Sequence, residues 1–512
     1  MAKRKLNILF LMADQLAASY LPAYGHQVVQ APHLTALADR GVVFDSFYTN
    51  APLCAPSRFT MMAGALPKRI GAFDNAADFS SDVPTFAHYL RAAGYRTTLT
   101  GKMHFCGPDQ LHGFEERLTT DIYPADYGWT PDWRHFDVRP SWYHNMLSVL
   151  QAGPAVRSNQ LDFDDEVTYT ARRHIYDVAR SADERPFCLT VSWTHPHDPY
   201  AAQPQLMDLY REDDIPLPQV RREDVPLDPH SARLRHVSDM EAYVIRDEHV
   251  RRARHAYFAN ISYIDQQVGQ LMQALKETGL DQNTVIVFTA DHGDMLGERG
   301  LWYKMNWFQD ACRIPLIVSA PGLFQSGRVA ASVSSIDLLP TLAEIAADGA
   351  AFSAAAPIDG RSLLPHLNRT GGHDEVIGEY CGEGAIAPLL MIRRGAWKYV
   401  CSTPDPDQLF DLSKDPLEKN DLAASPAHAQ LLADFRADAA RRWDVPALHA
   451  QVLASQQRRH MVYQSLSYGK HTSWDFQPSR DASTSYMRNH LVLDDLEYRS
   501  RLPHVGLPEA AE

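Results

Sequence analysis

A cysteine that could act as a nucleophile lies in the segment Leu53-Cys54-Ala55-Pro56-Ser57-Arg58. This segment follows an apolar, β-rich run over residues 42–48, and residues 57–64 have the composition of a helix. Free backbone N–H groups and the helix dipole favour a negative charge at such a junction. Cys54 is therefore either a candidate thiolate nucleophile or a small buried hydrophobic residue.

Further polar signatures follow apolar runs that are typical of buried parallel strands. They are Asp14-Gln15 after residues 6–13, Lys102-x-His104 after residues 97–100, His197 after residues 187–193, and Asp291-His292 after residues 284–290. Ligands of open α/β sheets bind at the carboxyl ends of the strands, so we expect these side chains to lie together.

The residue types at this edge predict two adjoining binding sites. Asp14 and Asp291 offer hard oxygen ligands, and with the amide or imidazole of their neighbours they suit one divalent cation. Cationic and imidazole side chains suit a tetrahedral oxyanion. The side chains expected at this oxyanion site are those of Arg58, Lys102, His104, His197 and Lys304. Each residue alone would be ordinary as a turn residue or a surface charge, but so many of them at one edge of a sheet are hard to obtain by chance.

The elements that position these residues alternate between strand and helix, which predicts a doubly wound α/β fold with a mostly parallel sheet. The expected helices cover residues 32–40, 57–64, 85–93, 164–179, 248–278 and 335–346, and a further strand covers residues 314–319. Short antiparallel strands are expected at residues 389–393 and 397–400. We therefore expect a catalytic domain over 1–375, a smaller α+β subdomain over 376–444, and a C-terminal helix and extended tail over 445–512.

Composition excludes several classes of function. The chain has 512 residues and a net charge of −14, which argues against a nucleic-acid partner. No apolar run approaches the ~18 residues of a transmembrane helix, so no membrane partner is expected. Six widely spaced cysteines without a Cys-x-x-Cys pair favour reduced thiols in the cytoplasm.

Aromatic residues are concentrated between residues 123 and 143, where Trp129 is one of seven. The segment is polar and interrupted by prolines between the rings, which is poorly suited to a buried core. Aromatic faces attract a quaternary ammonium group, which cannot donate a hydrogen bond. This segment is a candidate cation pocket, although a hydrophobic cluster beneath a long loop is the alternative.

The spacing Cys54-x-Pro56-Ser57-Arg58 resembles the signature of type I sulfatases, in which the cysteine is oxidised to formylglycine. Together with the strand-end motifs, it resembles the sulfatase branch of the alkaline phosphatase superfamily over residues 7–422. Within this branch the chain is similar to the choline sulfatase family. The stretches that carry this similarity are residues 101–105, 107–114, 123–131 and 294–300, with 474–478 and 486–490 in the tail.

The resemblance implies an alkaline phosphatase-like fold and a formylglycine made from Cys54. It implies one cation, Ca²⁺ first and Mn²⁺ or Mg²⁺ as alternatives, held by Asp14, Gln15, residue 54, Asp291 and His292. A hydrated formylglycine attacks sulfur, and its second hydroxyl then expels sulfate from the sulfated enzyme. Arg58 would hold the diol, Lys102 and Lys304 the sulfate oxygens, and His104 would assist at residue 54. His197 or Lys304 would protonate the leaving oxygen.

The resemblance also implies that the substrate is choline-O-sulfate, a small sulfate ester with a quaternary ammonium group. The pocket would comprise Trp129, Asn75, Asn145 and Glu383. A homo-oligomer, a dimer or a tetramer, is implied, and we expect the tail to embrace a neighbouring subunit with Asp494 or Asp495 near its active site. The alternatives are an arylsulfatase and a phosphonate or phosphate monoester hydrolase. Common arylsulfatases carry Asp-Asp and Asp-Asn where this chain has Asp14-Gln15 and Asp291-His292, and these two pairs also resemble those of phosphonate monoester hydrolases. An unmodified Cys54 would leave an oxyanion-binding protein without activity.

Overall fold

The computed structural model describes residues 5–123, 125–320, 322–469 and 492–500. They fall into two units, residues 1–473 and residues 474–512. The second unit contains one described helix, α15 (Leu493–Ser500). The tail stretches 474–478 and 486–490 lie outside the described residues. No helix in the described ranges is long and apolar enough to cross a membrane.

An eight-stranded sheet, in the order β10-β2-β9-β8-β1-β6-β3-β4, forms the centre of the first unit. Its central strand β1 pairs in parallel with β8 on one side and with β6 on the other, while β9 is antiparallel to both β2 and β8. The strands are β1 (Asn7–Asp14), β2 (Val42–Tyr48), β3 (Arg96–Gly101), β4 (Glu116–Arg117), β6 (Phe187–Pro196), β8 (Thr284–Ala290), β9 (Leu316–Ser319) and β10 (Gly327–Ser334).

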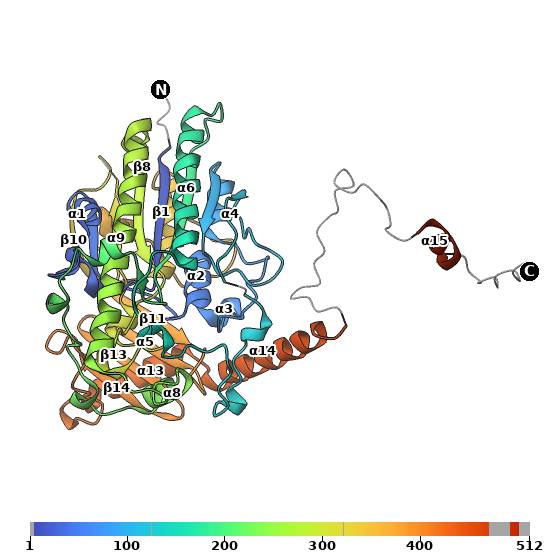
Figure 1. Ribbon diagram of the computed structural model, residues 1–512. Coiled ribbons are helices and arrows are strands. Elements are labelled where there is room, and N and C mark those ends of the chain that lie inside the picture. The colour runs from blue at the N-terminus through green and yellow to red at the C-terminus, as the bar shows by residue number, and fades with distance from the viewer. Residues whose placement is uncertain (1–4, 124, 321, 470–491, 501–512) are drawn as a thin grey trace, which may run out of the picture. The chain divides into compact units, whose positions relative to one another are not determined.

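Two groups of helices flank this sheet. The long helices α6 (Asn159–Arg180) and α9 (Asp247–Thr278) pack on β6 and on each other, and α1 (Pro32–Asp39) packs on α9. Figure 1 shows α6 and α9 running alongside β1. In the second group, α11 (Leu338–Ala346) packs on α2 (Cys54–Ala63) and on α4 (Phe86–Ala92), which contacts β3.

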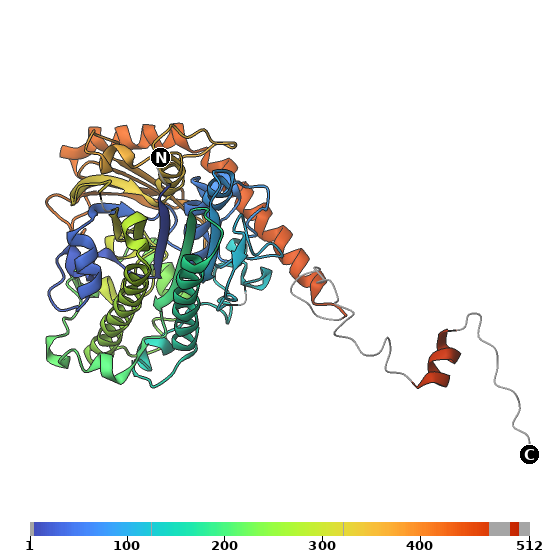
Figure 2. The ribbon, with the colours of Figure 1, turned by 90° about the horizontal axis from the view of Figure 1, so that it is seen from above.

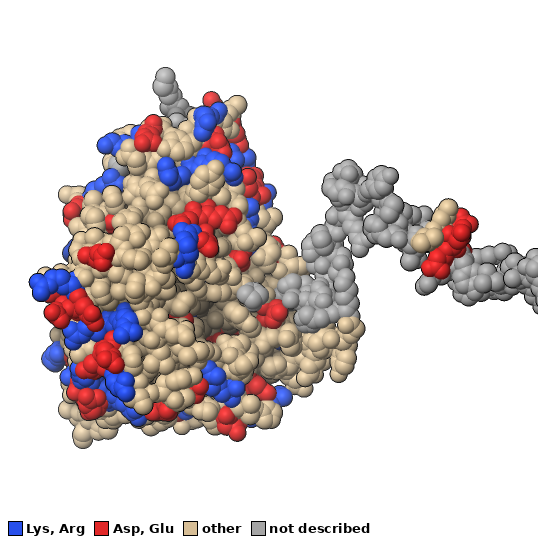
Figure 3. All heavy atoms as spheres, viewed as in Figure 1, with Lys and Arg blue, Asp and Glu red and all other residues tan. Residues whose placement is uncertain are grey.

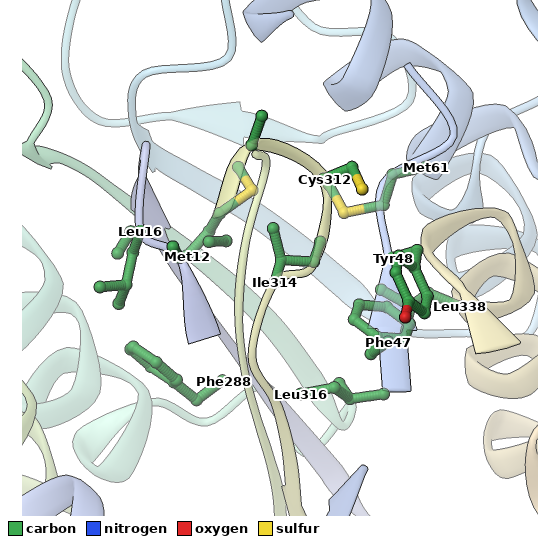
Figure 4. Packing of buried hydrophobic residues seen from close by; sticks show 14 of the residues in the cluster. Met12, Leu16, Phe47, Tyr48, Met61, Phe288, Cys312, Ile314, Leu316 and Leu338 are labelled. Carbon is green, nitrogen blue, oxygen red and sulfur yellow. The ribbon is translucent and has the colours of Figure 1, made fainter. Parts of the chain in front are cut away.

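The core lies between these layers. Every residue of β1 is buried, as a strand covered on both faces must be. Figure 4 shows Met12, Leu16 and Phe288 on one side of the segment that carries Ile314, with further apolar side chains on the other. Burying an apolar side chain of this size contributes roughly 1.5–3 kcal/mol, so this packing fixes the strand ends that carry polar residues.

A smaller antiparallel sheet follows, in the order β11-β12-β13-β14. Helix α13 (Ala429–Arg442) packs on it through the Phe435 ring, which stacks on Tyr399 with 5.5 Å between ring centroids. Helix α14 (Val445–Leu466) follows in the same unit, and Figure 2 shows it running outward from beside the small sheet. The strands are β11 (Glu375–Tyr380), β12 (Leu389–Arg394), β13 (Trp397–Ser402) and β14 (Asp405–Asp411).

The remaining described elements are short. They are the paired strands β5 (Gly153–Pro154) and β7 (Ala201–Ala202), and the helices α3 (Pro67–Ile70), α5 (Leu147–Leu150), α7 (Pro204–Met207), α8 (Pro229–Val237), α10 (Gln309–Cys312) and α12 (Leu364–Leu367).

The predicted fold class, a doubly wound and mostly parallel sheet with a smaller antiparallel subdomain, is confirmed. Two details differ from expectation. Helix α2 begins at Cys54 rather than at Ser57, because Pro56 is tolerated within a first helical turn. Strand β10 was not expected, because its small and polar residues lie at the sheet edge, where several are exposed. The division at residues 375 and 444 stays a prediction.

Candidate active site

The sheet order brings the polar strand ends together. Strand β1 ends at Asp14, and its neighbours β6 and β8 lead directly into His197 and Asp291. Strand β3, on the far side of β6, leads into Lys102. Since parallel strands share one carboxyl edge, these four residues lie at the same edge of the sheet. All four are buried.

Cys54 occupies the first turn of α2 at this edge, and its Sγ lies 3.2 Å from Nε2 of His292. Burial would raise the pKa of the Cys54 thiol, but the charges of Lys102 and Lys304, with the two imidazoles of His292 and His104, hold it well below its usual range. The site therefore stabilises a negative charge on residue 54.

Arg58 lies one turn further along α2 and is fully buried. Its Nε donates to Asp291 Oδ2 at 2.9 Å, its Nη1 donates to Ser192 Oγ at 2.9 Å, and its Nη2 lies 3.3 Å from Asp14 Oδ2. Arg58 thus ties helix α2 to the ends of β1 and β8 and offsets the charge of two buried carboxylates.

A possible cation site lies beside Cys54. Ligand atoms of Asp14, Cys54, Asp291 and His292 all lie within 4.8 Å of one another. Burial would raise the pKa of the Asp14 carboxyl, but Lys102, His197 and Arg58 hold it well below its usual range, so it is ionised. Its Oδ1 is buried without a hydrogen-bond partner among the described residues, as an oxygen reserved for a metal ion would be. This donor set fits a divalent cation.

Gln15, the fifth predicted ligand, is adjacent but already hydrogen-bonded. It has a left-handed backbone with φ of 62°. Its Nε2 donates to Asp294 Oδ2 at 2.7 Å, and its Oε1 accepts from Lys304 Nζ at 2.7 Å. Gln15 therefore links the cation site to Lys304.

Four of the five predicted oxyanion residues line one cavity of about 230 Å³ together with Cys54. Lys304 Nζ lies 2.9 Å from His197 Nε2, while His197 Nδ1 lies 2.7 Å from the Asp198 carbonyl oxygen. Nδ1 therefore carries the proton and Nε2 accepts from the Lys304 ammonium. The other predicted members in this lining are Lys102 and His104; Arg58 lies behind it.

Aromatic rings line the same cavity, and we call Trp129, Trp142 and Tyr143 with Asn75 and Glu383 its aromatic half. Trp129 and Trp142 are nearly parallel, with 6.2 Å between ring centroids and 5° between planes, and Trp142 contacts Tyr143 edge to face. Asn75 and Glu383 are the predicted polar residues in the lining. Burial raises the pKa of Glu383 to about 8. Figure 3 shows a hollow on the face that carries α5 in Figure 1.

Other predicted substrate residues are placed differently. Asn145 is not part of the cavity lining, because its Oδ1 accepts from the Leu147 backbone N–H at 2.8 Å at the start of α5. Asp494 and Asp495 lie in the first turn of α15, in the second unit, and their proposed role at a neighbouring active site stays a prediction.

Several lining residues were not predicted as site residues. Asp198 was recognisable in principle, since it follows His197 at the end of β6. Val237 and Ser238 lie at the end of α8, in a polar segment whose sequence contains no recognisable motif. The further unpredicted lining residues are His144, Gln160, Pro199 and Met305.

Comparisons with known proteins give matches over most of the chain. Residues 6–348 match the family model described as sulfatase, and residues 450–502 match the model described as choline sulfatase enzyme C terminal. Residues 297–442 match the model for the C-terminal part of N-sulphoglucosamine sulphohydrolase. The chain is 48% identical to a choline-sulfatase of Rhizobium meliloti (strain 1021) over 98% of this chain and 99% of the relative.

More distant relatives and solved structures also match. Arylsulfatase K of Danio rerio is 27% identical over 82% of this chain and 80% of its own. The solved structure of a phosphonate monoester hydrolase from Silicibacter pomeroyi matches with a TM-score of 0.68 and 25% identity, over 86% of this chain and 95% of that one. A solved 2-O GAG sulfatase matches with a TM-score of 0.67, 22% identity, and coverage of 90% and 94%.

Proposed function

Because this chain belongs to the sulfatase family, we propose that it hydrolyses choline-O-sulfate to choline and sulfate. One observation carries the choice of substrate: a single cavity joins a cationic half around Cys54 to an aromatic half with a carboxyl group. The first half suits a sulfate ester, and the second suits a quaternary ammonium. The C-terminal family match and the choline-sulfatase relative support the same substrate.

The residues at the cationic half have distinct roles in this proposal. Cys54 is converted to formylglycine, and one oxygen of its hydrate attacks sulfur as the ester bond to choline breaks. The second hydroxyl then loses its proton, and the carbonyl re-forms and expels sulfate. Lys102 and Lys304 bind sulfate oxygens and offset the charge that develops in the transition state. His104 assists at residue 54. The buried cations also restrict the ester to one orientation, with its leaving oxygen toward His197.

Protonation of the leaving oxygen falls to the pair formed by Lys304 and His197. Lys304 Nζ lies 2.9 Å from His197 Nε2 and 2.7 Å from Gln15 Oε1, so its ammonium is held at the cavity wall. Lys304 can deliver a proton directly from its ammonium, whereas His197 can deliver one only after its Nε2 has taken it from Lys304.

A divalent cation at Asp14, Gln15, Asp291, His292 and residue 54 would supply Lewis acidity beside the nucleophile. We propose Ca²⁺ first, since two carboxylates and an amide are oxygen donors, with Mn²⁺ or Mg²⁺ as alternatives. The unpartnered Asp14 Oδ1 supports a bound ion.

A second candidate function is hydrolysis of phosphonate or phosphate monoesters. The solved phosphonate monoester hydrolase shares the fold at 25% identity, and tetrahedral phosphoryl oxyanions suit the same lysines. The aromatic half of the cavity favours the choline ester over this alternative.

Two measurements test the proposal. The peptide that contains residue 54 should be about 18 Da lighter than its cysteine form, since sulfur and hydrogen give way to oxygen. Steady-state kinetics should give a higher kcat/KM for choline sulfate than for phosphonate or neutral sulfate esters, and Cys54→Ala should abolish turnover. Turnover by Cys54→Ala within about tenfold of wild type, roughly 1.4 kcal/mol of barrier, would contradict the covalent mechanism.

We also propose a cytoplasmic homo-oligomer, a dimer or a tetramer. All six cysteines are unpaired in the structure, which supports a reducing compartment. The C-terminal match over residues 450–502 supports a conserved role for the tail, for which subunit contact is our proposal.

A further inference from the structure

We propose that Arg459, on helix α14, is a positioning residue that sets the specificity of the ammonium half of the cavity. The inference rests on the proposed function. Arg459 and its neighbour Gln456 do not line the cavity. They contact the segments that carry three lining residues, Asn75, Trp129 and Glu383, which we call three walls of the cavity. Helix α14 runs beside residues 127–134, as the views in Figures 1 and 2 show.

The first wall is held through Asp74. The guanidinium of Arg459 forms a bidentate ion pair with this carboxylate, at 2.5 Å from Nη1 and 2.7 Å from Nη2, and Asp74 is fully buried. Asp74 precedes Asn75, which lines the cavity and accepts at 3.0 Å from the backbone N–H of Ala55. A shift of Asp74 would therefore move Asn75 directly.

The second wall is held through Thr130. Arg459 Nη1 lies 3.3 Å from Thr130 Oγ1, and the short helix at Tyr127–Trp129 packs on α14. Trp129 is consequently fixed from behind by the same guanidinium that fixes Asn75. Its ring is also stacked parallel to Trp142, so a tilt of one ring would disturb the aromatic surface as a whole.

The third wall is held through Trp133. Gln456 Oε1 accepts from the Trp133 backbone N–H at 3.2 Å, and the indole N–H of Trp133 donates to the Gly382 carbonyl oxygen at 3.2 Å. Gly382 precedes Glu383, the cavity carboxyl group. Gln456 and Trp133 are both nearly inaccessible to solvent, so neither contact is replaced readily by water.

The sulfate half depends on other supports. Lys102 and His197 leave strands β3 and β6 of the central sheet, and Lys304 is held by Gln15 and His197. Helix α14 therefore supports the segments of Asn75, Trp129 and Glu383, while the strand ends of the central sheet support Lys102 and His197. The two sets touch where Asn75 accepts from the Ala55 N–H and where the Trp129 ring lies 5.7 Å from that of His104. Because the lysines and His197 do not depend on α14, loosening this helix should reduce the efficiency on a cationic ester more than on a neutral one.

The test compares kcat/KM for choline sulfate and for 4-nitrophenyl sulfate, which has no cation. Arg459→Lys keeps a positive charge beside Asp74 but loses the two-pronged contact. Because displacements near 1 Å can reduce rates about a hundredfold, we expect at least a tenfold loss on choline sulfate, mostly in KM, and less than a threefold loss on the neutral ester. Gln456→Ala should show the same preference with smaller losses.

Arg254→Lys is the matched control. Arg254 on α9 is as deeply buried and pairs with Glu298 at 3.4 Å, and neither residue lines the cavity. This control should lower the melting temperature but leave the ratio of the two efficiencies unchanged. If Arg459→Lys folds but loses equal efficiency on both esters, so that the ratio of the two kcat/KM values is unchanged, the inference is overturned. If Arg459→Lys does not fold, the same ratio measured in Gln456→Ala decides. A wild-type enzyme without turnover of choline sulfate would instead overturn the proposed function.

Discussion

Glu383 gives the cavity a carboxyl group whose charge should change with pH between about 7 and 9. It is 6% exposed, and burial raises its pKa to about 8, with Asp74 adding to the effect. Its Oε2 has no hydrogen-bond partner among the described residues. The group is therefore mostly neutral at pH 7 and becomes a carboxylate as the pH rises through 8.

The sign and size of the effect follow from this pKa. A carboxyl group with a pKa of about 8 is roughly 10% ionised at pH 7 and roughly 90% ionised at pH 9. Only the ionised form attracts the quaternary ammonium, and kcat/KM reports the free enzyme. The efficiency on choline sulfate, divided by that on 4-nitrophenyl sulfate, should therefore rise about tenfold between pH 7 and pH 9 and then level off.

The assay measures both efficiencies from pH 6 to pH 10, and their ratio cancels titrations of the catalytic groups that act on both esters. Glu383→Gln should make the ratio independent of pH. Glu379→Gln is the matched control, since Glu379 is buried with a raised pKa but does not line the cavity, and it should keep the rise. A flat ratio in the wild type, or a rise that persists in Glu383→Gln, would refute the reasoning.

Three further predictions concern the metal, the aromatic wall and the tail. Asp14→Ala and Asp291→Ala should each lose the bound cation and most activity; unchanged metal content per chain in elemental analysis would contradict the ligand assignment. Trp129→Ala should reduce kcat/KM on choline sulfate by about two- to thirtyfold more than on a neutral ester, since a cation–π contact contributes about 0.5–2 kcal/mol; equal losses would show that the ring only shapes the pocket. Deletion of the residues after Leu466 should change the number of subunits measured by light scattering, and an unchanged number would count against an oligomerisation arm.

The cationic half of the site could be predicted from the sequence because its residues follow directly from strands. Continuous apolar runs identify buried parallel strands, and such strands share one carboxyl edge. Asp14, Lys102, His197 and Asp291 each follow such a run, so their convergence required no knowledge of loop structure. Cys54 stood out because its spacing to Pro56, Ser57 and Arg58 resembles the type I sulfatase signature, whereas its place in the same helix as Arg58 came from the structure.

The ammonium half depends on loops and on contacts between distant segments, which no local pattern encodes. Val237 reaches the cavity from the end of α8, and Asn145 is diverted from it by a hydrogen bond two residues along the chain. Asp74 and Arg459 are 385 residues apart, and only the packing of α14 brings them together. The sequence by itself thus determined which groups gather at the carboxyl edge of the sheet, because strand periodicity is local. The tertiary structure alone decided which walls face the cation, because loop paths follow from packing across the whole unit.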